Sequence, residues 1–372
     1  MRYSAVGIAV TIVLGAARAS SAQVITIPLT PAEWIATDTI KFGEHLGQSA
    51  VYINSGVAMS RSAHFHNGTL EFDIAAPPRA SNLGIAFHAQ RSDMFETLFF
   101  RPGASGTDLA LQYAPAVNSV AAAWQIWHGE GANVAVQVPR DKWIHVKLMV
   151  AGDSAWVFLD RAATPVLTIP RLGLGGTGAD VGLWGGGFGR GAWYANMTYT
   201  VDNSTYQHVT ELLPRGTIAD WQLSEMFDAP AVTPGKLPDL AKLKWQTVTL
   251  EPAGFVLVNR YRRSPSIVPP SNLDSMMHNQ VAGSKVVFAR TFIDSDRART
   301  QLLHFGYSDN IVIYCNGQPI FSGINAMNVR DNGYFYPLGD AVFLPLRKGR
   351  NEIVYAVTDF FGGWAFSGRL AP

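Results

Sequence analysis

The stretch that decides the fold is Trp143-Ile144-His145-Val146-Lys147-Leu148-Met149-Val150, near the middle of a 372-residue chain. Ile, Val and Leu occupy every second position, which is the spacing of a β-strand with one face buried. The same alternation recurs in residues 69–74, 155–159 and 181–184. No comparable helical period runs through the rest of the chain. The pattern therefore predicts a protein built almost wholly from short strands.

Turn residues separate these strands at short intervals. The clearest case is Asn316-Gly317, which follows the apolar run 311–315 and precedes residues 318–321. An Asn-Gly pair suits a type I′ turn because both central positions need positive φ. We expect about nine strands between Trp245 and Arg369, which is consistent with a jelly-roll sandwich. The fold class expected is all-β, with two sandwiches in series.

Four segments can be distinguished along the chain. Residues 1–22 are typical of a secretory signal peptide, with Arg2, an uncharged apolar stretch of 13 residues and Ser-Ser-Ala before Gln23. That apolar stretch falls short of the ~20 residues that span a bilayer, so no transmembrane segment is expected after cleavage. We expect sandwiches over residues 23–206 and 244–372, with a Pro-rich connector at 207–243. The expected location is periplasmic or extracellular.

The charge balance excludes one class of partner. The chain has 29 Lys and Arg against 28 Asp and Glu, and removing the signal peptide takes away two of the basic residues. Nucleic-acid binding depends on basic residues that neutralise phosphates. A nearly neutral chain predicts no nucleic-acid partner.

Residues 23–206 resemble concanavalin A-like, laminin-G-like jelly rolls, and in particular the 3-keto-disaccharide hydrolase-like family. The resemblance is carried by residues 67–73, 84–87, 99–102, 111–113, 143–147, 157–160 and 181–184. It implies a sandwich fold shared by lectins, hydrolases and adhesion modules. It implies no cofactor, with calcium as the one cation that such sandwiches often hold.

Residues 244–372 are similar to galactose-binding-like β-sandwiches that accompany bacterial carbohydrate-active proteins. The matching stretches are 303–309, 314–317, 344–346, 349–352 and 361–366. The resemblance implies a second, non-catalytic sandwich whose loops carry any binding function.

The segment between residues 95 and 127 collects the residue types of a sugar cleft. Aromatic faces stack on apolar sugar faces, and planar polar groups fix the orientation of hydroxyls. The candidate ligand-binding residues are Glu96, Arg101, Gln112, Tyr113, Trp124 and Trp127. The alternative is an ion pair between Arg101 and Glu96, with both tryptophans in the core.

Three carboxylates are candidates for catalysis: Glu71, Asp73 and Glu96. Glu71 and Asp73 lie two positions apart, so they face the same side of one strand and can serve as a pair of catalytic carboxylates. The laminarinase-type signature, which also occurs on this fold, continues to a further Glu two residues later, where this chain has Ala75. The alternative is that both carboxylates lie on a solvated face opposite Leu70 and Phe72.

His64 and His66 are the candidate metal ligands, because two imidazoles on one strand face can bind a metal if a third ligand arrives from elsewhere. The alternative is ordinary surface histidines.

These observations favour carbohydrate recognition through the jelly-roll cleft. One alternative is a glycan-cleaving hydrolase of the 3-keto-disaccharide hydrolase type. Another is an assembly subunit that binds a second envelope protein through loops and edge strands. The expected partner is therefore a glycan or oligosaccharide, or else an envelope protein.

Overall fold

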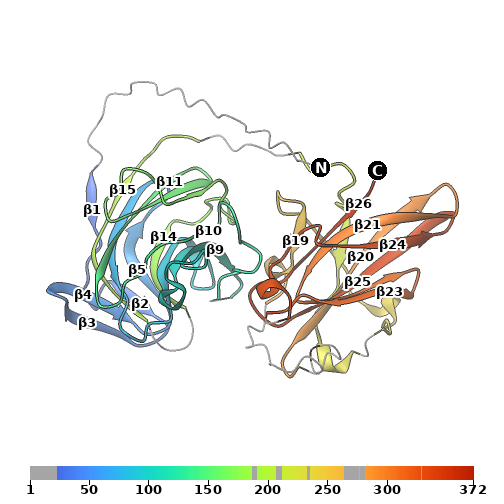
Figure 1. Ribbon diagram of the computed structural model, residues 1–372, viewed down its shortest axis with the longest axis horizontal. Helices are drawn as coiled ribbons and strands as arrows, with labels where there is room; N and C mark the ends of the chain where they lie inside the picture. The colour runs from blue at the N-terminus through green and yellow to red at the C-terminus, as the bar shows by residue number, and fades with distance from the viewer. Residues whose placement is uncertain are drawn as a thin grey trace.

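The computed structural model describes residues 23–119, 121–186, 191–206, 212–232, 235–263, 276, 281–327 and 329–372. The expected signal peptide lies outside these residues. Figure 1 shows two sandwiches side by side, the first in blue to green and the second in yellow to red. The described residues form antiparallel strands, with turns, irregular loops and a few short 3-10 turns between them. The predicted all-β fold is confirmed.

The first sandwich packs two sheets face to face. One sheet has the order β13(Leu167–Ile169), β12(Ser154–Leu159), β11(Trp143–Ala151), β6(Gly68–Ala75), β15(Ala192–Val201), β4(Gln48–Ile53) and β3(Ile40–His45), with β1(Val24–Thr26) also paired to β15. The other has the order β10(Asn133–Val134), β9(Leu111–Val117), β8(Met94–Phe100), β7(Asn82–Arg91), β14(Asp180–Gly186), β5(Gly56–His64) and β2(Trp34–Ala36).

The alternation in β11 is borne out. Ile144, Val146 and Leu148 are buried in the main core of the first sandwich, whereas the intervening residues are partly exposed. Apolar side chains on one face of each strand meet those of the opposite sheet, and this burial drives the two sheets together.

The second sandwich has a larger and a smaller sheet. The larger has the order β18(Gln246–Val248), β16(Trp221–Leu223), β20(Lys285–Ser295), β25(Gly349–Asp359), β22(Asn310–Cys315) and β23(Gln318–Ile324), with β17(Phe227–Asp228) also paired to β20. The smaller has the order β19(Phe255–Leu257), β26(Ala365–Leu370), β21(Arg299–Ser308) and β24(Asp340–Leu346). The 3-10 turns of the chain are η1(Pro102–Ala104), η2(Ala229–Ala231), η3(Leu240–Lys242), η4(Val258–Arg260) and η5(Asp331–Gly333).

Two details of the second sandwich bear on the sequence predictions. Asn316 and Gly317 both have positive φ, at 50° and 82°, between β22 and β23, so the predicted hairpin turn is confirmed. The connector predicted at 207–243 needs correction, because β16 and β17 pair with β20 inside the second sandwich. The indole of Trp221 is fully buried there. The sequence predicted a linker here because the two short strands lie among prolines and glycines. Their burial depends on pairing with β20, which lies far along the chain.

A loop of the first sandwich joins the two units. This docking loop, residues 121–128, presents Gln125 to the second sandwich. The backbone N–H of Gln125 donates to the Gly362 carbonyl at 3.1 Å, and its carbonyl accepts from the Phe335 N–H at 2.8 Å. Its side-chain Nε2 donates to the Asn332 carbonyl at 2.7 Å. The two sandwiches are therefore held by a buried hydrogen-bonded contact.

Candidate functional site

The six predicted ligand residues do not share one surface. Glu96 and Tyr113 point between the two sheets of the first sandwich, and both are fully buried. Arg101 and Gln112 extend from the opposite face of the same strands, and Trp124 and Trp127 lie on the docking loop. Side chains alternate faces along a strand, so residues an odd number of positions apart on one strand point to opposite faces of the sheet. The alternative ion pair between Arg101 and Glu96 is not formed.

Arg101 lies between two aromatic rings. Its guanidinium carbon is 4.6 Å from the centre of the Phe99 ring and 5.4 Å from that of Trp124. Nη1 donates to the Leu109 carbonyl at 3.0 Å. Burial lowers the pKa of Arg101 to about 10, which leaves it charged at neutral pH. The structure thus brings two of the candidate residues, Arg101 and Trp124, together as a cation–π pair.

Gln112 has a structural task. Its Nε2 donates to the backbone carbonyls of Trp124 and Trp127, at 2.8 and 2.5 Å. The side chain is fully buried. Gln112 therefore fixes the docking loop against β9 and presents no polar group to solvent.

Trp127 contributes to a cleft between the two sandwiches, which we call the interdomain cleft. Its volume is about 460 Å³, inside the range of about 300–1,000 Å³ common for ligand sites. It is lined by Trp127, Asp153, Arg171, Leu172, Gly173, Leu174, Gly175, Glu251, Pro252, Ala253, Phe255 and Arg260. The Trp127 and Phe255 rings form an aromatic wall, with their centres 5.9 Å apart in an edge-to-face arrangement.

Charged pairs from both sandwiches line the same cleft. In the first sandwich, Arg171 Nε lies 3.5 Å from Asp153 Oδ2. In the second, Arg260 donates from Nε and Nη2 to the two oxygens of Glu251, at 2.5 and 2.8 Å. The cleft therefore combines apolar ring faces with planar donors and acceptors.

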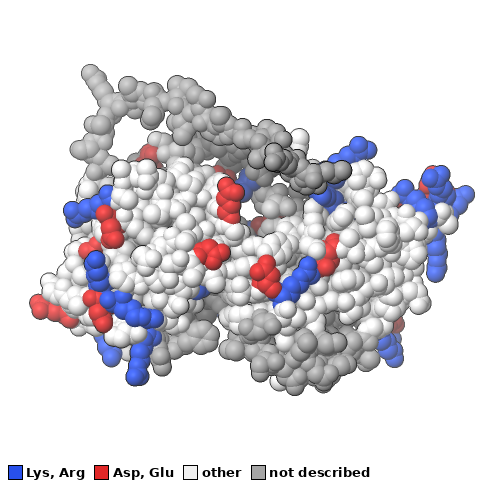
Figure 2. Space-filling view, in the orientation of Figure 1, with Lys and Arg blue, Asp and Glu red and all other residues white. Residues whose placement is uncertain are grey.

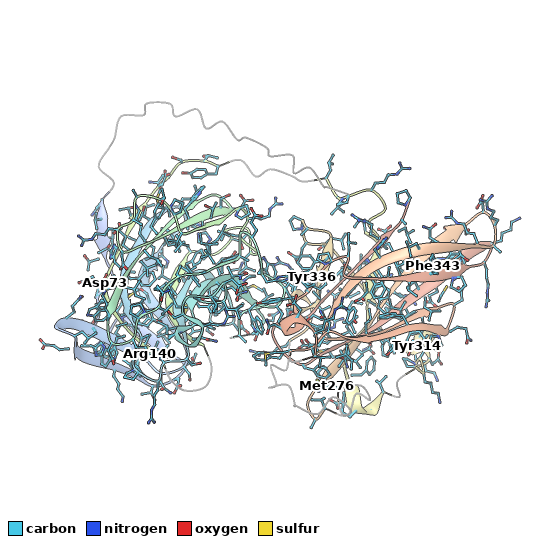
Figure 3. The ribbon with its side chains drawn as sticks, in the orientation of Figure 1. Asp73, Arg140, Met276, Tyr314, Tyr336 and Phe343 are labelled. Carbon is cyan, nitrogen blue, oxygen red and sulfur yellow. The ribbon has the colours of Figure 1, made fainter. Side chains whose placement is uncertain are left out.

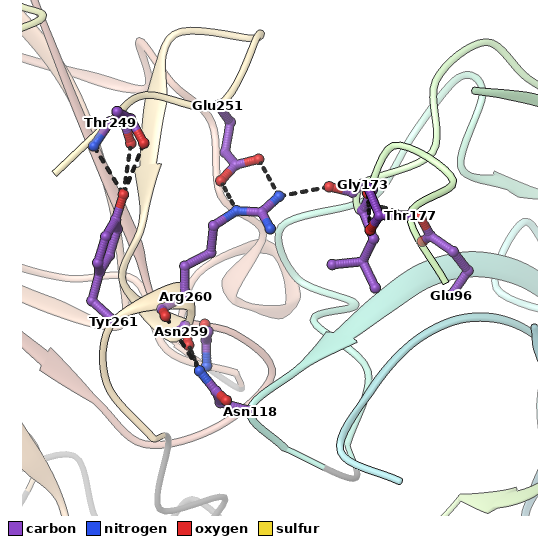
Figure 4. A network of polar contacts seen from close by, with 10 residues as sticks. Glu96, Asn118, Gly173, Thr177, Thr249, Glu251, Asn259, Arg260 and Tyr261 are labelled. Atoms are coloured by element: carbon purple, nitrogen blue, oxygen red, sulfur yellow. Dashed lines mark hydrogen bonds and ion pairs between the residues drawn. The ribbon is translucent and has the colours of Figure 1, made fainter. Parts of the chain in front are cut away.

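Arg260 links the cleft to the first sandwich, as Figure 4 shows. Its Nη2 also donates to the Gly173 carbonyl at 2.7 Å. The next residue, Leu174, donates its N–H to Glu96 Oε1 at 2.7 Å, and Tyr113 donates its hydroxyl to Glu96 Oε2 at 2.7 Å. Burial raises the pKa of Glu96 to about 7, although the two hydrogen bonds and the charge of Arg260 act in the opposite direction. Glu96 therefore lies behind the cleft and holds the backbone of Leu174, one of the residues that line it.

The Glu251–Arg260 pair supplies a test of this joint. Replacing Glu251 with Ala leaves Arg260, whose side chain is 30% exposed, without its carboxylate, so we expect the protein to lose about 2–3 kcal/mol of stability. Replacing Lys242 with Ala removes the exposed pair with Asp239 and should change stability by less than about 0.5 kcal/mol. Calorimetric unfolding of both variants checks the prediction. Equal transitions for the two would contradict it.

Glu71 and Asp73 lie on the solvated face of β6, and one histidine joins them. His145 on β11 is 3.2 Å from Glu71 Oε2 through Nε2 and 2.8 Å from Asp73 Oδ1 through Nδ1. Asn196 donates to Asp73 Oδ2 at 2.7 Å. Figure 3 places Asp73 on the side of the first sandwich away from the second, and Tyr336 between the two. The sequence paired the two carboxylates correctly but did not identify His145.

The metal candidates do not gather ligands in the described residues. His64 Nδ1 lies 3.1 Å from Asp180 Oδ1, and the backbone carbonyl of His66 faces His88 Nε2 at 2.5 Å. Within the described ranges, no three His, Cys, Asp or Glu side chains are arranged to hold a metal ion.

Sequence reasoning missed most of the cleft. Asp153, Arg171, Glu251 and Arg260 belong to no motif, because they come from separate loops. One signal was present at Gly173, where a Cβ would lie 2.6 Å from Pro115 Cγ and 2.9 Å from Trp127 Cζ2. A glycine that permits such close contact marks a point where another segment packs.

No family model matches the chain, and no curated protein matches it. Among solved structures, the carbohydrate-binding module CBM66 from Bacillus subtilis is 16% identical, with a TM-score of 0.30 over 48% of this chain and 93% of that one. The β-glucanase of Bacillus licheniformis is 12% identical, with a TM-score of 0.30 over 50% of this chain and 100% of that one. The VIP36 exoplasmic/lumenal domain, bound to Ca²⁺ and Man3GlcNAc, is 10% identical, with a TM-score of 0.34 over 50% and 90% of the two chains.

At these TM-scores the likeness decides neither the ligand nor the chemistry of this chain. Its all-β sandwich architecture stands on its own strand pairing.

Proposed function

We propose that this protein binds a glycan in the interdomain cleft. The observation that carries the proposal is that the aromatic wall of Trp127 and Phe255 lines the same cleft as Arg171 and Arg260. Ring faces stack on the C–H faces of sugars, and guanidinium forks bind hydroxyls and carboxylates with fixed geometry. The proposal keeps the function expected from the sequence and moves the site from the jelly-roll cleft to the contact between the sandwiches.

The ion pairs favour recognition over cleavage at this cleft. Both oxygens of Glu251 are held by Arg260, and the side chain is only 8% exposed. Asp153 has one oxygen, Oδ2, at 3.5 Å from Arg171 Nε. A general acid needs a proton to give, and a nucleophile needs a free oxygen aimed at the substrate. Carboxylates held by arginine orient a ligand better than they attack it.

We further propose that this recognition takes place in the periplasm or outside the cell. The proposal rests on the signal-like residues 1–22. Within the described residues, no helix is long and apolar enough to span a bilayer.

A glycan-array screen of residues 23–372, run with and without a calcium chelator, tests the main proposal. We expect selective retention of a small set of glycans, and a loss with chelator would reveal a bound metal. If no glycan is retained, the proposal fails. A pull-down from an envelope extract would then test the role as an assembly subunit.

A blocking variant tests the site. Ala253 is exposed and lines the cleft, so replacing it with Trp fills the space and leaves the ion pairs in place. We expect at least a tenfold loss of affinity for the retained glycan. Ala163, exposed in the turn after β12, is the matched control for the same replacement. Unchanged binding by A253W would place the site elsewhere.

A glycan-cleaving activity of the 3-keto-disaccharide hydrolase type is the second candidate, and the Glu71–His145–Asp73 arrangement favours it. An imidazole between two carboxylates can move a proton to or from a bound sugar. The test measures the release of monosaccharide from disaccharides and from their keto derivatives. If the wild-type protein has this activity, the E71Q and D73N variants should lack it. Activity that survives in both variants excludes this group of residues.

A further inference from the structure

Five exposed cations gather on two turns at the end of the second sandwich that lies far from the first. Arg297 lies in the β20–β21 turn and Arg299 is the first residue of β21. Arg347 and Lys348 form the β24–β25 turn, and Arg350 lies at the start of β25. We call these five residues the basic tip. The turns are neighbours because Ser295 pairs with Gly349, and Arg299 with Leu346. Figure 2 shows blue side chains gathered at this end of the molecule.

The basic tip carries more positive charge than the neighbouring acidic residues neutralise. Among the described residues, none of its five side chains takes part in an ion pair within 4.0 Å. Asp294 and Asp296 are the acidic residues of the same turns. In a chain with 29 basic and 28 acidic residues, this end therefore carries a local excess of positive charge, which attracts anions.

Both turns are held in place by buried side chains. Asn351 is fully buried, and its Nδ2 donates to the carbonyls of Ile293, Arg347 and Gly349 at 3.2, 2.9 and 2.9 Å. Its Oδ1 accepts from the Arg347 N–H at 2.8 Å. In the other turn, the Ser295 hydroxyl donates to the Arg297 carbonyl at 2.7 Å. Fixed turns reduce the ordering cost that a ligand must offset.

A ladder of rings and guanidinium groups continues from the basic tip along the larger sheet. The guanidinium of Arg350 lies 3.8 Å from the centre of the Phe292 ring, and that of Arg290 lies 4.0 Å from the Trp245 ring and 5.5 Å from the Phe292 ring. Phe292 is 37% exposed. A groove of about 630 Å³ runs beside it, lined by Asp220, Trp221, Gln222, Thr247, Val248, Arg290, Phe292 and Arg350.

We propose that the basic tip and this groove bind an acidic polysaccharide. Uronate or sulfate groups would pair with the tip cations, while a sugar ring lies on Phe292 and its hydroxyls bond to Gln222 and Thr247. Asp220 and Glu352 beside the groove can accept hydrogen bonds from sugar hydroxyls, which the rings of a polysaccharide carry and the interior of a DNA strand lacks, so the groove favours a polysaccharide over DNA. This site is separate from the interdomain cleft and does not depend on it.

Binding to heparin and to polygalacturonate, with dextran as the neutral comparison, tests the proposal on the chain of residues 23–372. We expect binding to at least one acidic polymer, none to dextran, and weakening as salt rises because exposed charges are screened. The sulfated and the carboxylated polymer identify which anion is preferred. Failure to bind either would overturn the proposal, as would equally tight binding of duplex DNA.

Two variants locate the site. Replacing Arg297, Arg299 and Lys348 together with Glu, or Phe292 alone with Ala, should each lower affinity at least tenfold. The control carries the same charge change on exposed Lys41, Arg79 and Lys142 of the first sandwich and should bind like wild type. Equal losses in the control and the tip variant would overturn the proposal. A253W should leave this binding unchanged, which separates failure here from failure at the interdomain cleft.

Discussion

Replacing Glu96 with Gln should increase stability relative to wild type, by an amount that grows by about 3 kcal/mol between pH 4 and pH 8. Burial raises the pKa of Glu96 from 4.5 to about 7. A carboxyl whose pKa is raised on folding stabilises the protein fully below its ordinary pKa, and that contribution is lost as pH rises through the folded value. A shift of this size corresponds to about 3 kcal/mol. Glutamine does not ionise, so the stability of E96Q lacks this pH-dependent loss.

The measured quantity is the difference between the two unfolding curves across the pH range, obtained by calorimetry or urea denaturation. A difference is needed because burial also lowers the pKa of His88 to about 4, so that the fold loses stability as pH falls from 6.5. Glu44 is exposed on β3, and E44Q is the control for the same replacement at a solvated carboxylate. A constant difference between E96Q and wild type would show that Glu96 ionises normally.

Replacing Gly362 with Ala should destabilise the joint between the sandwiches by about 2–4 kcal/mol. A Cβ at Gly362 would lie 2.0 Å from Gln125 Oε1, 2.5 Å from Cδ and 2.8 Å from Cγ. Gln125 is fully buried and bonded to Asn332, so it has little room to withdraw. Overpacking costs about 1–3 kcal/mol. The φ of +87° adds backbone strain for any residue with a Cβ.

Two further variants separate these causes. Gly317 has a similar φ of +82°, and no atom lies within 4 Å of the place that a Cβ would occupy there, so G317A measures the backbone strain alone. Replacing Gln125 with Ala in the G362A background removes the clash and should recover the overpacking part of the loss. Thermal unfolding measures all four proteins, and small-angle scattering reports any separation of the sandwiches. If G362A and G317A lose the same stability, overpacking against Gln125 does not contribute to the loss in G362A.

The candidate site was predictable in its residue types and not in its arrangement. All seven residues of β8 are apolar or buried, from Met94 to Phe100. No alternation along that strand tells the inner face from the outer one. The sequence therefore grouped Glu96 with Arg101 as candidate ligand residues, although the Glu96 side chain points between the sheets. Trp124 and Trp127 had the residue type expected of a cleft, but the cleft also needs Phe255 and Arg260, more than 120 residues away.

The sequence by itself determined the strands and their buried faces, because period-two alternation and turn residues act within a few positions. This is why residues 69–74, 143–150 and 311–317 were predicted correctly. Only the tertiary structure decided that β16 and β17 belong to the second sandwich, that Gln125 docks between Gly333 and Gly362, and that Arg260 reaches Gly173. These contacts join segments far apart in the chain, and the free energy that selects them comes from packing and hydrogen bonds that no local pattern records.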